Sequence, residues 1–137
     1  MENISTGGCA CGAVRYEISA DPVMSANCYC RDCQRSTGGA MAPVMVVPKS
    51  AFRLTKGSLK YHSVVGESGK NVERGFCVAC GAPVTSKLGA MPDVMVLKAG
   101  SLDEPARFKP TMNIFLSSAQ PWATVAPGLK NFDKMPG

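Results

Sequence analysis

The sequence predicts an all-β fold. Segments rich in β-branched and aromatic residues recur at short spacing along the chain, and turn signals separate them. No segment carries a sustained 3.6-residue apolar repeat, so long amphipathic helices are not expected. The 14 glycines and 10 prolines are spread over the whole chain, as in domains built from many short strands joined by turns.

The predicted strands follow one another from the N-terminal part of the chain to residue 115. Turns at 48–50, 56–58, 66–69 and 89–92, each containing Pro or Gly, separate the central strands. The most apolar segment, 40–47, is interrupted by Pro43. The predicted strands are 14–19, 40–47, 52–54, 59–63, 72–77, 83–87, 94–99 and 112–115.

Helices are expected only as single turns, one after Cys30 and one around 117–122. The proline-containing tail, 121–137, is expected to run as an extended strap over the sheet. The aromatic side chains of Trp122 and Phe132 are its predicted anchors.

Length and composition predict one compact domain over residues 1–137, with 45% hydrophobic and 18% charged residues. No stretch approaches the roughly 18 apolar residues that span a bilayer, so no membrane segment is expected. The N-terminus lacks the basic and apolar regions of a secretory signal, which favours the cytoplasm. If all seven cysteines bind two zinc ions as thiolates, the formal charge falls from +5 to about +2, which argues against nucleic acid as a partner.

The seven cysteines fall into three groups. Cys9 and Cys11 form C-x-C, residues 28–33 carry C-x-C-x-x-C, and Cys77 and Cys80 form C-x-x-C before Gly81. An odd number of cysteines without a secretory signal argues against a disulfide framework and for bound metal. In C-x-x-C, a tight turn brings both sulfur atoms to about 2.3 Å from one zinc ion, and Gly81 supplies the permissive backbone.

The number of ligands that zinc needs favours a division of the seven cysteines into a group of four and a group of three. Cys77 and Cys80 need two partners for a closed tetrahedral site, and Cys9 and Cys11 supply two. The remaining cysteines, at 28, 30 and 33, would leave one position open to water or to a substrate thiol, which is typical of a catalytic zinc site. Two alternatives remain: free thiols, or a second structural zinc with a distant ligand such as His62, the only histidine.

Together these motifs resemble the glutathione-dependent formaldehyde-activating enzymes, a family that also contains centromere protein V. The resemblance covers nearly the whole chain. It is carried by Gly8-Cys9-Ala10-Cys11-Gly12-Ala13-Val14-Arg15-Tyr16, by Cys28-Tyr29-Cys30-Arg31-Asp32-Cys33-Gln34-Arg35-Ser36-Thr37-Gly38, by Arg74-Gly75-Phe76-Cys77-Val78-Ala79-Cys80-Gly81, and by Gly100-Ser101-Leu102-Asp103-Glu104-Pro105.

The resemblance implies folded antiparallel sheets around a structural zinc held by Cys9, Cys11, Cys77 and Cys80. It also implies a labile, catalytic zinc on Cys28, Cys30 and Cys33, with glutathione as co-substrate. The implied activity is that of a carbon–sulfur lyase, which joins glutathione and formaldehyde into S-(hydroxymethyl)glutathione in the synthetic direction.

The chain departs from the family pattern at two positions. Tyr29 and Asn113 stand where the family commonly has histidine, so a base that titrates near neutral pH is missing there. The same chemistry on a different electrophile is therefore an alternative. A non-enzymic zinc module that binds another macromolecule is a second alternative, and glutathione as a carrier of zinc is a third.

Three arginines near the cysteines receive provisional roles. Arg31 and Arg35 flank Cys33 and are the candidates for binding the two carboxylates of glutathione, or else for neutralising the cysteine thiolates. Arg74 is interpreted as a structural residue that connects a strand to the C-x-x-C loop.

Overall fold

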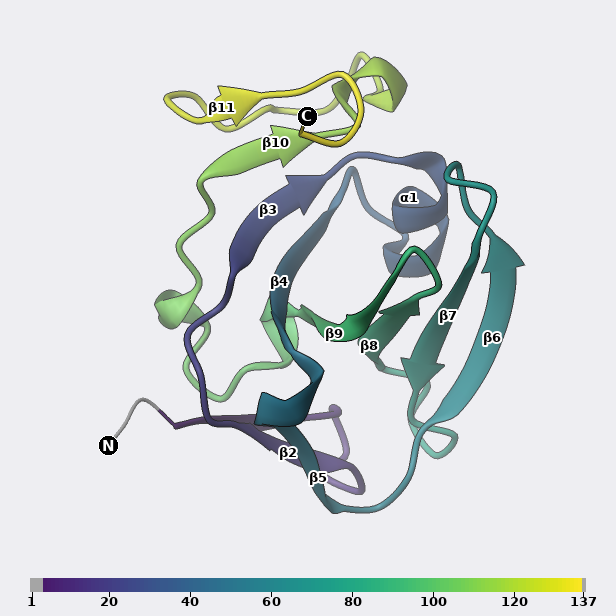
Figure 1. The fold of residues 1–137 in the computed structure, drawn as a ribbon, viewed down its shortest axis with the longest axis vertical. Coiled ribbons are helices and arrows are strands. Elements are labelled where there is room, and N and C mark those ends of the chain that lie inside the picture. Colours follow the sequence, from purple (N-terminus) through teal and green to yellow (C-terminus); the bar gives the residue numbers. More distant parts are fainter. Residues whose placement is uncertain (1–3, 137) are drawn as a thin grey trace.

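The computed structural model describes residues 4–136 and confirms the all-β prediction (Figure 1). A small antiparallel sheet has the order β1-β2-β5, and an eight-stranded sheet has the order β11-β10-β3-β4-β9-β8-β7-β6. Within the large sheet, β10 pairs in parallel with both β3 and β11, and the other pairs are antiparallel. The strands are β1 (Ser5–Gly8), β2 (Arg15–Ile18), β3 (Met24–Cys28), β4 (Ala42–Pro48), β5 (Phe52–Lys56), β6 (Lys60–Val65), β7 (Asn71–Phe76), β8 (Pro83–Leu88), β9 (Met91–Lys98), β10 (Met112–Ile114) and β11 (Lys130–Asn131).

All eight predicted strands are present, and three further strands were not predicted. The missed strands, β1, β3 and β11, consist mostly of small or polar residues, which carry little β-propensity. The omission of β3 matters most, because its last residue is Cys28 and its pairing with β4 holds that cysteine in place.

The large sheet is buried on both faces where β4 and β9 run through its middle. On β4, Met45 and Val47 enter one apolar cluster, whereas Val44 and Val46 enter another on the opposite face. Because side chains alternate along a strand, a strand that is buried on both sides reads as an unbroken apolar run. This explains the apolar composition of segment 40–47.

Helix α1 (Arg31–Thr37) is longer than the predicted single turn. The Cys30 side chain accepts a hydrogen bond from the backbone N–H of Cys33 at its start, and Gly38 ends it with a φ of 74°. Four short 3-10 helices complete the described fold: η1 (Lys49–Ala51), η2 (Ala99–Ser101), η3 (Pro105–Arg107) and η4 (Leu116–Ser118), the last of which overlaps the start of the helical turn predicted around 117–122.

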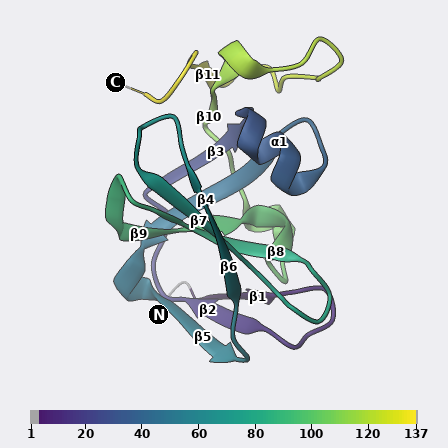
Figure 2. The same cartoon turned by 90° about the vertical axis from the view of Figure 1, so that its right-hand side faces the viewer.

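The small sheet and the C-terminal segment lie at opposite ends of the molecule (Figures 1 and 2). The C-terminal segment is held by backbone hydrogen bonds, including one from Phe132 N to Asn113 O and one from Leu116 N to Phe132 O. Phe132 packs against the buried cluster, as predicted, but the prediction for Trp122 was wrong, because 68% of that side chain is exposed. The backbone ladder, rather than the indole ring, attaches this segment.

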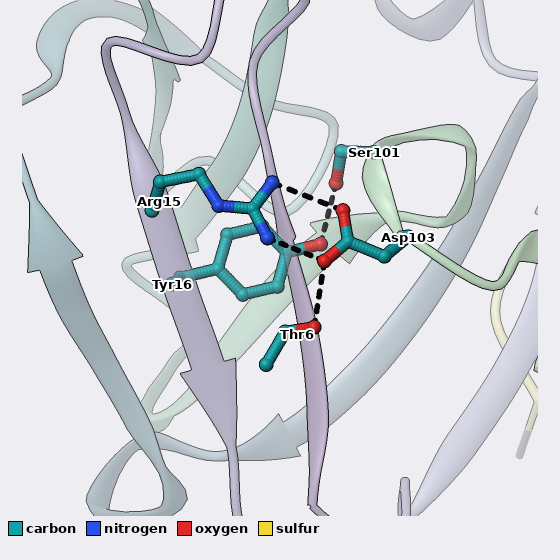
Figure 3. Close-up of polar contacts among 5 residues, drawn as sticks. All are labelled: Thr6, Arg15, Tyr16, Ser101 and Asp103. Atoms are coloured by element: carbon teal, nitrogen blue, oxygen red, sulfur yellow. Dashed lines mark hydrogen bonds and ion pairs between the residues drawn. The ribbon is translucent and has the colours of Figure 1, made fainter.

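A polar network joins the small sheet to the loop after β9 (Figure 3). Two hydrogen bonds link the guanidinium of Arg15 to the carboxylate of Asp103, and Thr6 Oγ1 donates to the same carboxylate over 2.6 Å. The Tyr16 hydroxyl lies 2.6 Å from Ser101 Oγ, which donates to the carbonyl of Lys98 over 2.7 Å. The network therefore positions the end of β9, where Lys98 lies.

Candidate metal centres

The seven cysteines form two separate clusters. Within each cluster all the sulfur atoms lie within 4.8 Å of one another. None of the seven forms a disulfide bond. The first cluster contains Cys9, Cys11, Cys77 and Cys80, and the second contains Cys28, Cys30 and Cys33.

Two hairpin turns build the four-cysteine cluster. Cys9 and Cys11 lie between β1 and β2, and the other two cysteines lie between β7 and β8. Gly81 has a φ of 77°, and its N–H donates to Cys77 O over 2.7 Å, which closes the C-x-x-C turn as the sequence suggested. The cluster thus connects the small sheet to the large one.

The sulfur spacing of this cluster fits tetrahedral zinc. Cys11 Sγ lies 3.7 Å from Cys9 Sγ and 3.9 Å from Cys77 Sγ. Four thiolates at about 2.3 Å from one zinc ion stand about 3.8 Å apart, from tetrahedral geometry. These two distances therefore match those expected around a tetrahedral zinc ion.

The three-cysteine cluster lies where β3 meets α1. Cys28 and Cys33 are buried, and Cys30 is half-buried. Hydrogen bonds from the Cys28 and Cys30 thiols lower the pKa of Cys33 to about 3, and the positive charges of Lys98 and Arg74 act in the same direction. The same contacts with Cys30 and Cys33 raise the pKa of Cys28. Three thiolates this close repel one another unless a cation lies among them, so the donor set fits a metal ion.

The three cysteines line a cavity of about 360 Å³. Apolar side chains of the large sheet form the floor of this cavity. Two cationic residues, Arg74 of β7 and Lys98 of β9, also line the cavity. Only 6% of Lys98 is exposed, and this burial lowers the pKa of its ammonium group. Apolar lining residues include Met24, Val44, Val46, Leu88, Val96, Ile114 and Phe115.

These two cations add to what the sequence suggested. Arg74, interpreted as a purely structural residue, lies against the cavity that contains the three cysteines. Lys98 was not identified, although a lysine within the apolar segment 94–99 was a usable signal, because an isolated charge is rarely buried without a partner.

The two arginines of α1 differ in their position relative to the cavity. Arg31 lines the cavity and bonds to Gln34 Oε1, whereas Arg35 is exposed and is not among the cavity-lining residues. His62, the alternative fourth ligand, is exposed on β6 and belongs to neither cysteine cluster.

Tyr29 and Asn113 do not line the cavity. The Tyr29 hydroxyl lies 3.5 Å from the carbonyl of Thr124, to which it donates. Asn113 is fully buried, accepts a hydrogen bond from Asn27 and donates to Ala126 O and Asn131 Oδ1. Both side chains therefore face the C-terminal segment rather than the cavity, although their backbones adjoin Cys28.

Among the described residues, no helix is both long and apolar enough to cross a membrane.

Comparison with known proteins agrees with this geometry. The family model described as glutathione-dependent formaldehyde-activating enzyme matches residues 4–118, which include all seven cysteines. The crystal structure of a Rhodobacter sphaeroides protein is similar, with a TM-score of 0.60 and 19% sequence identity. That match covers 93% of this chain and 98% of the other, and it shows a shared fold. The chain belongs to the glutathione-dependent formaldehyde-activating enzyme family.

Proposed function

We propose that this protein is a zinc-dependent carbon–sulfur lyase that also runs in the synthetic direction, joining glutathione and formaldehyde into S-(hydroxymethyl)glutathione. The observation that carries the proposal is a three-cysteine cluster in the wall of a cavity of about 360 Å³. A three-ligand zinc site keeps a position for a substrate, whereas a four-ligand site does not. Family membership supplies the thiol and the one-carbon electrophile.

The two clusters have different proposed roles. Cys9, Cys11, Cys77 and Cys80 hold a structural zinc ion, which attaches the small sheet to the β7–β8 turn. Cys28, Cys30 and Cys33 hold a labile zinc ion at the cavity. Bound there, the ion supplies a Lewis acid that keeps a substrate thiol deprotonated near neutral pH.

Charge around the cavity supports an anionic substrate. Three thiolates and one divalent cation would carry a net single negative charge. The cavity lining also includes Arg31 and Asp32, whose charges cancel, and Glu67. Lys98 and Arg74 are the cations whose positive charges act on Cys33. Because burial strengthens electrostatic interactions, these two cations favour the ionised form of the incoming thiol.

The addition itself needs no redox partner. The sulfur lone pair of glutathione forms the new carbon–sulfur bond, and the π pair of the carbonyl moves to its oxygen, which takes a proton from water. The carboxylates of glutathione are assigned to Arg31 and Arg35, and Arg31 is the better placed because it lines the cavity. The cytoplasm, where thiols stay reduced, suits this chemistry.

The direct test is exchange between formaldehyde, glutathione and S-(hydroxymethyl)glutathione at equilibrium, followed by NMR. Zinc-loaded protein should accelerate the exchange over buffer, and Cys30→Ala should abolish the acceleration. Arg31→Gln should raise KM for glutathione several-fold at unchanged kcat, and more than the matched exposed variant Arg35→Gln. Exchange at the buffer rate with two bound zinc ions would refute the proposed activity.

The non-enzymic alternative makes a separate prediction. A module that binds nucleic acid would shift a duplex probe at moderate salt, with an affinity that falls steeply as salt rises. Catalysed exchange without such a shift would favour the enzyme.

A further inference from the structure

The floor of the cavity contains a row of residues that crosses five strands of the large sheet. Arg74 on β7 is paired with Ser86 on β8, which is paired with Val96 on β9. Val96 pairs with Val46 on β4, and Val46 pairs with Met24 on β3. All five residues line the cavity. The row is polar at the Arg74 end and apolar along the rest.

The polar end of the row has two buried atoms without a hydrogen-bond partner in the described protein. They are Arg74 Nε and Ser86 Oγ. Cross-strand neighbours have Cβ atoms about 5 Å apart, so both groups can reach a single oxygen atom between them. Buried polar atoms without partners are rare, because each keeps the cost of its lost hydration. Both atoms are covered in this conformation, and an oxygen acceptor in the cavity would satisfy both once their side chains turn toward it.

The apolar part of the row is too large for a one-carbon substrate. At about 30 Å³ of liquid volume per non-hydrogen atom, 360 Å³ accommodates roughly a dozen such atoms. Formaldehyde has two. Glutathione does not account for the apolar floor, because a carboxylate placed against its valine and methionine side chains would be desolvated without a partner. Its charged ends suit the exposed Arg31 instead.

We propose that the cavity binds an apolar carbonyl compound of about five to eight carbons, with its oxygen on Arg74 Nε and Ser86 Oγ and its chain over Val96, Val46 and Met24. This proposal rests on the proposed function, from which it takes the addition of the glutathione thiol to a carbonyl carbon. The electrophile is then a medium-chain aldehyde. The glutathione sulfur forms a bond to the aldehyde carbon, and the π pair moves to the oxygen. The two donors stabilise that oxyanion until it takes a proton from water.

The test uses binding of unreactive primary amides, which present a carbonyl oxygen and cannot accept the thiol. Zinc-loaded protein is titrated with butanamide, hexanamide and octanamide by calorimetry, and by NMR of Val methyl groups and arginine Nε–H. We expect Kd to fall about fourfold per added methylene until the cavity is full. The Arg74 Nε–H and Val96 methyl resonances should shift together.

A matched pair of variants isolates the oxygen site. Ser86→Ala should weaken hexanamide binding about five- to tenfold. Ser63→Ala, on exposed β6 and outside the cavity, should leave it unchanged. If Ser86→Ala does not fold, the wild-type NMR titration alone decides the question. The absence of binding at millimolar hexanamide would overturn the proposal. Binding without a shift of the Arg74 Nε–H resonance would overturn it too, because it would mean that bound water, rather than the ligand oxygen, satisfies this group.

Turnover separates this proposal from the proposed function. With glutathione present, hexanal should be turned over with at least tenfold higher kcat/KM than formaldehyde. Turnover of formaldehyde without amide binding would overturn the larger substrate and leave the proposed function intact. Amide binding at Arg74 and Ser86 with no turnover of either aldehyde would support the cavity ligand and refute the proposed activity.

Discussion

Asn27 and Asn113 lie opposite each other on the parallel strands β3 and β10, and Asn27 Nδ2 donates to Asn113 Oδ1 over 3.1 Å. Both residues are buried. Asn113 uses its own amide N–H groups on Ala126 O and Asn131 Oδ1, so it links the sheet to the C-terminal segment. The Asn113 side chain, which departs from the family pattern, therefore has a structural role and does not line the cavity, although its strand pairs with the end of β3 at Cys28.

Asn113→Ala should lower the free energy of unfolding by about 1–3 kcal/mol, because it leaves the buried Asn27 amide without its acceptor. Asn131→Ala is the control. It removes an exposed partner and should cost less than about 1 kcal/mol. Urea denaturation in saturating zinc measures both. Equal effects of the two substitutions would contradict the assignment of Asn113 as the buried link.

Gly7 makes a close approach that a side chain would block. A Cβ at this position would meet the carbonyl oxygen of Ser101 and the hydroxyl of Tyr16 well inside contact distance. Gly7→Ala should therefore destabilise the protein by about 1–3 kcal/mol through overpacking. Gly100→Ala, with open space around its Cβ, should be neutral within about 0.5 kcal/mol. A neutral Gly7→Ala would show that the small sheet and the loop after β9 do not pack as described.

The ion pair of Arg15 and Asp103 has a predictable pH dependence. Hydrogen bonds from Arg15 and Thr6 lower the pKa of Asp103 to about 2. A lowered carboxyl pKa contributes stability that is complete above the unfolded pKa of about 3.9 and is lost as pH falls toward 2. The stability difference between wild type and Asp103→Asn should stay constant from about pH 8 to pH 5 and narrow below about pH 4.

This difference is measured by denaturation of both proteins at each pH, so that acid release of zinc, common to both, cancels. Added salt should reduce it, since the pair is partly exposed. A difference that already changes between about pH 5 and pH 8 would mean that another group titrates with Asp103.

The sequence predicted the parts of the fold that depend on local pattern. Strands β4 and β9 are recognisable because burial on both faces requires continuous apolar residues. Cysteine spacing predicted which sulfur atoms gather together, because a chelating pair needs only a short turn. Strand β3 was missed because Ser25 and Asn27 are buried by pairing on both sides, which no local composition indicates.

The cavity was beyond prediction for a similar reason. Arg74 and Lys98 are 24 positions apart in the sequence and come together only through the order of strands β7, β8 and β9. Tyr29 illustrates the converse case. It lies between two cysteines in the sequence, yet its side chain contacts the C-terminal segment, because neighbouring side chains in extended backbone point to opposite sides.

Zinc stoichiometry, before and after treatment with a competing zinc chelator, tests the division of the seven thiolates into four and three most directly. The purified protein should hold two zinc ions, and the chelator should reduce this to one, because a site with three protein ligands releases its ion more readily than a closed one. Cys30→Ala should hold one zinc ion in both conditions. Two ions retained by wild type at chelator concentrations that exceed the protein many-fold would contradict the account and make both sites structural.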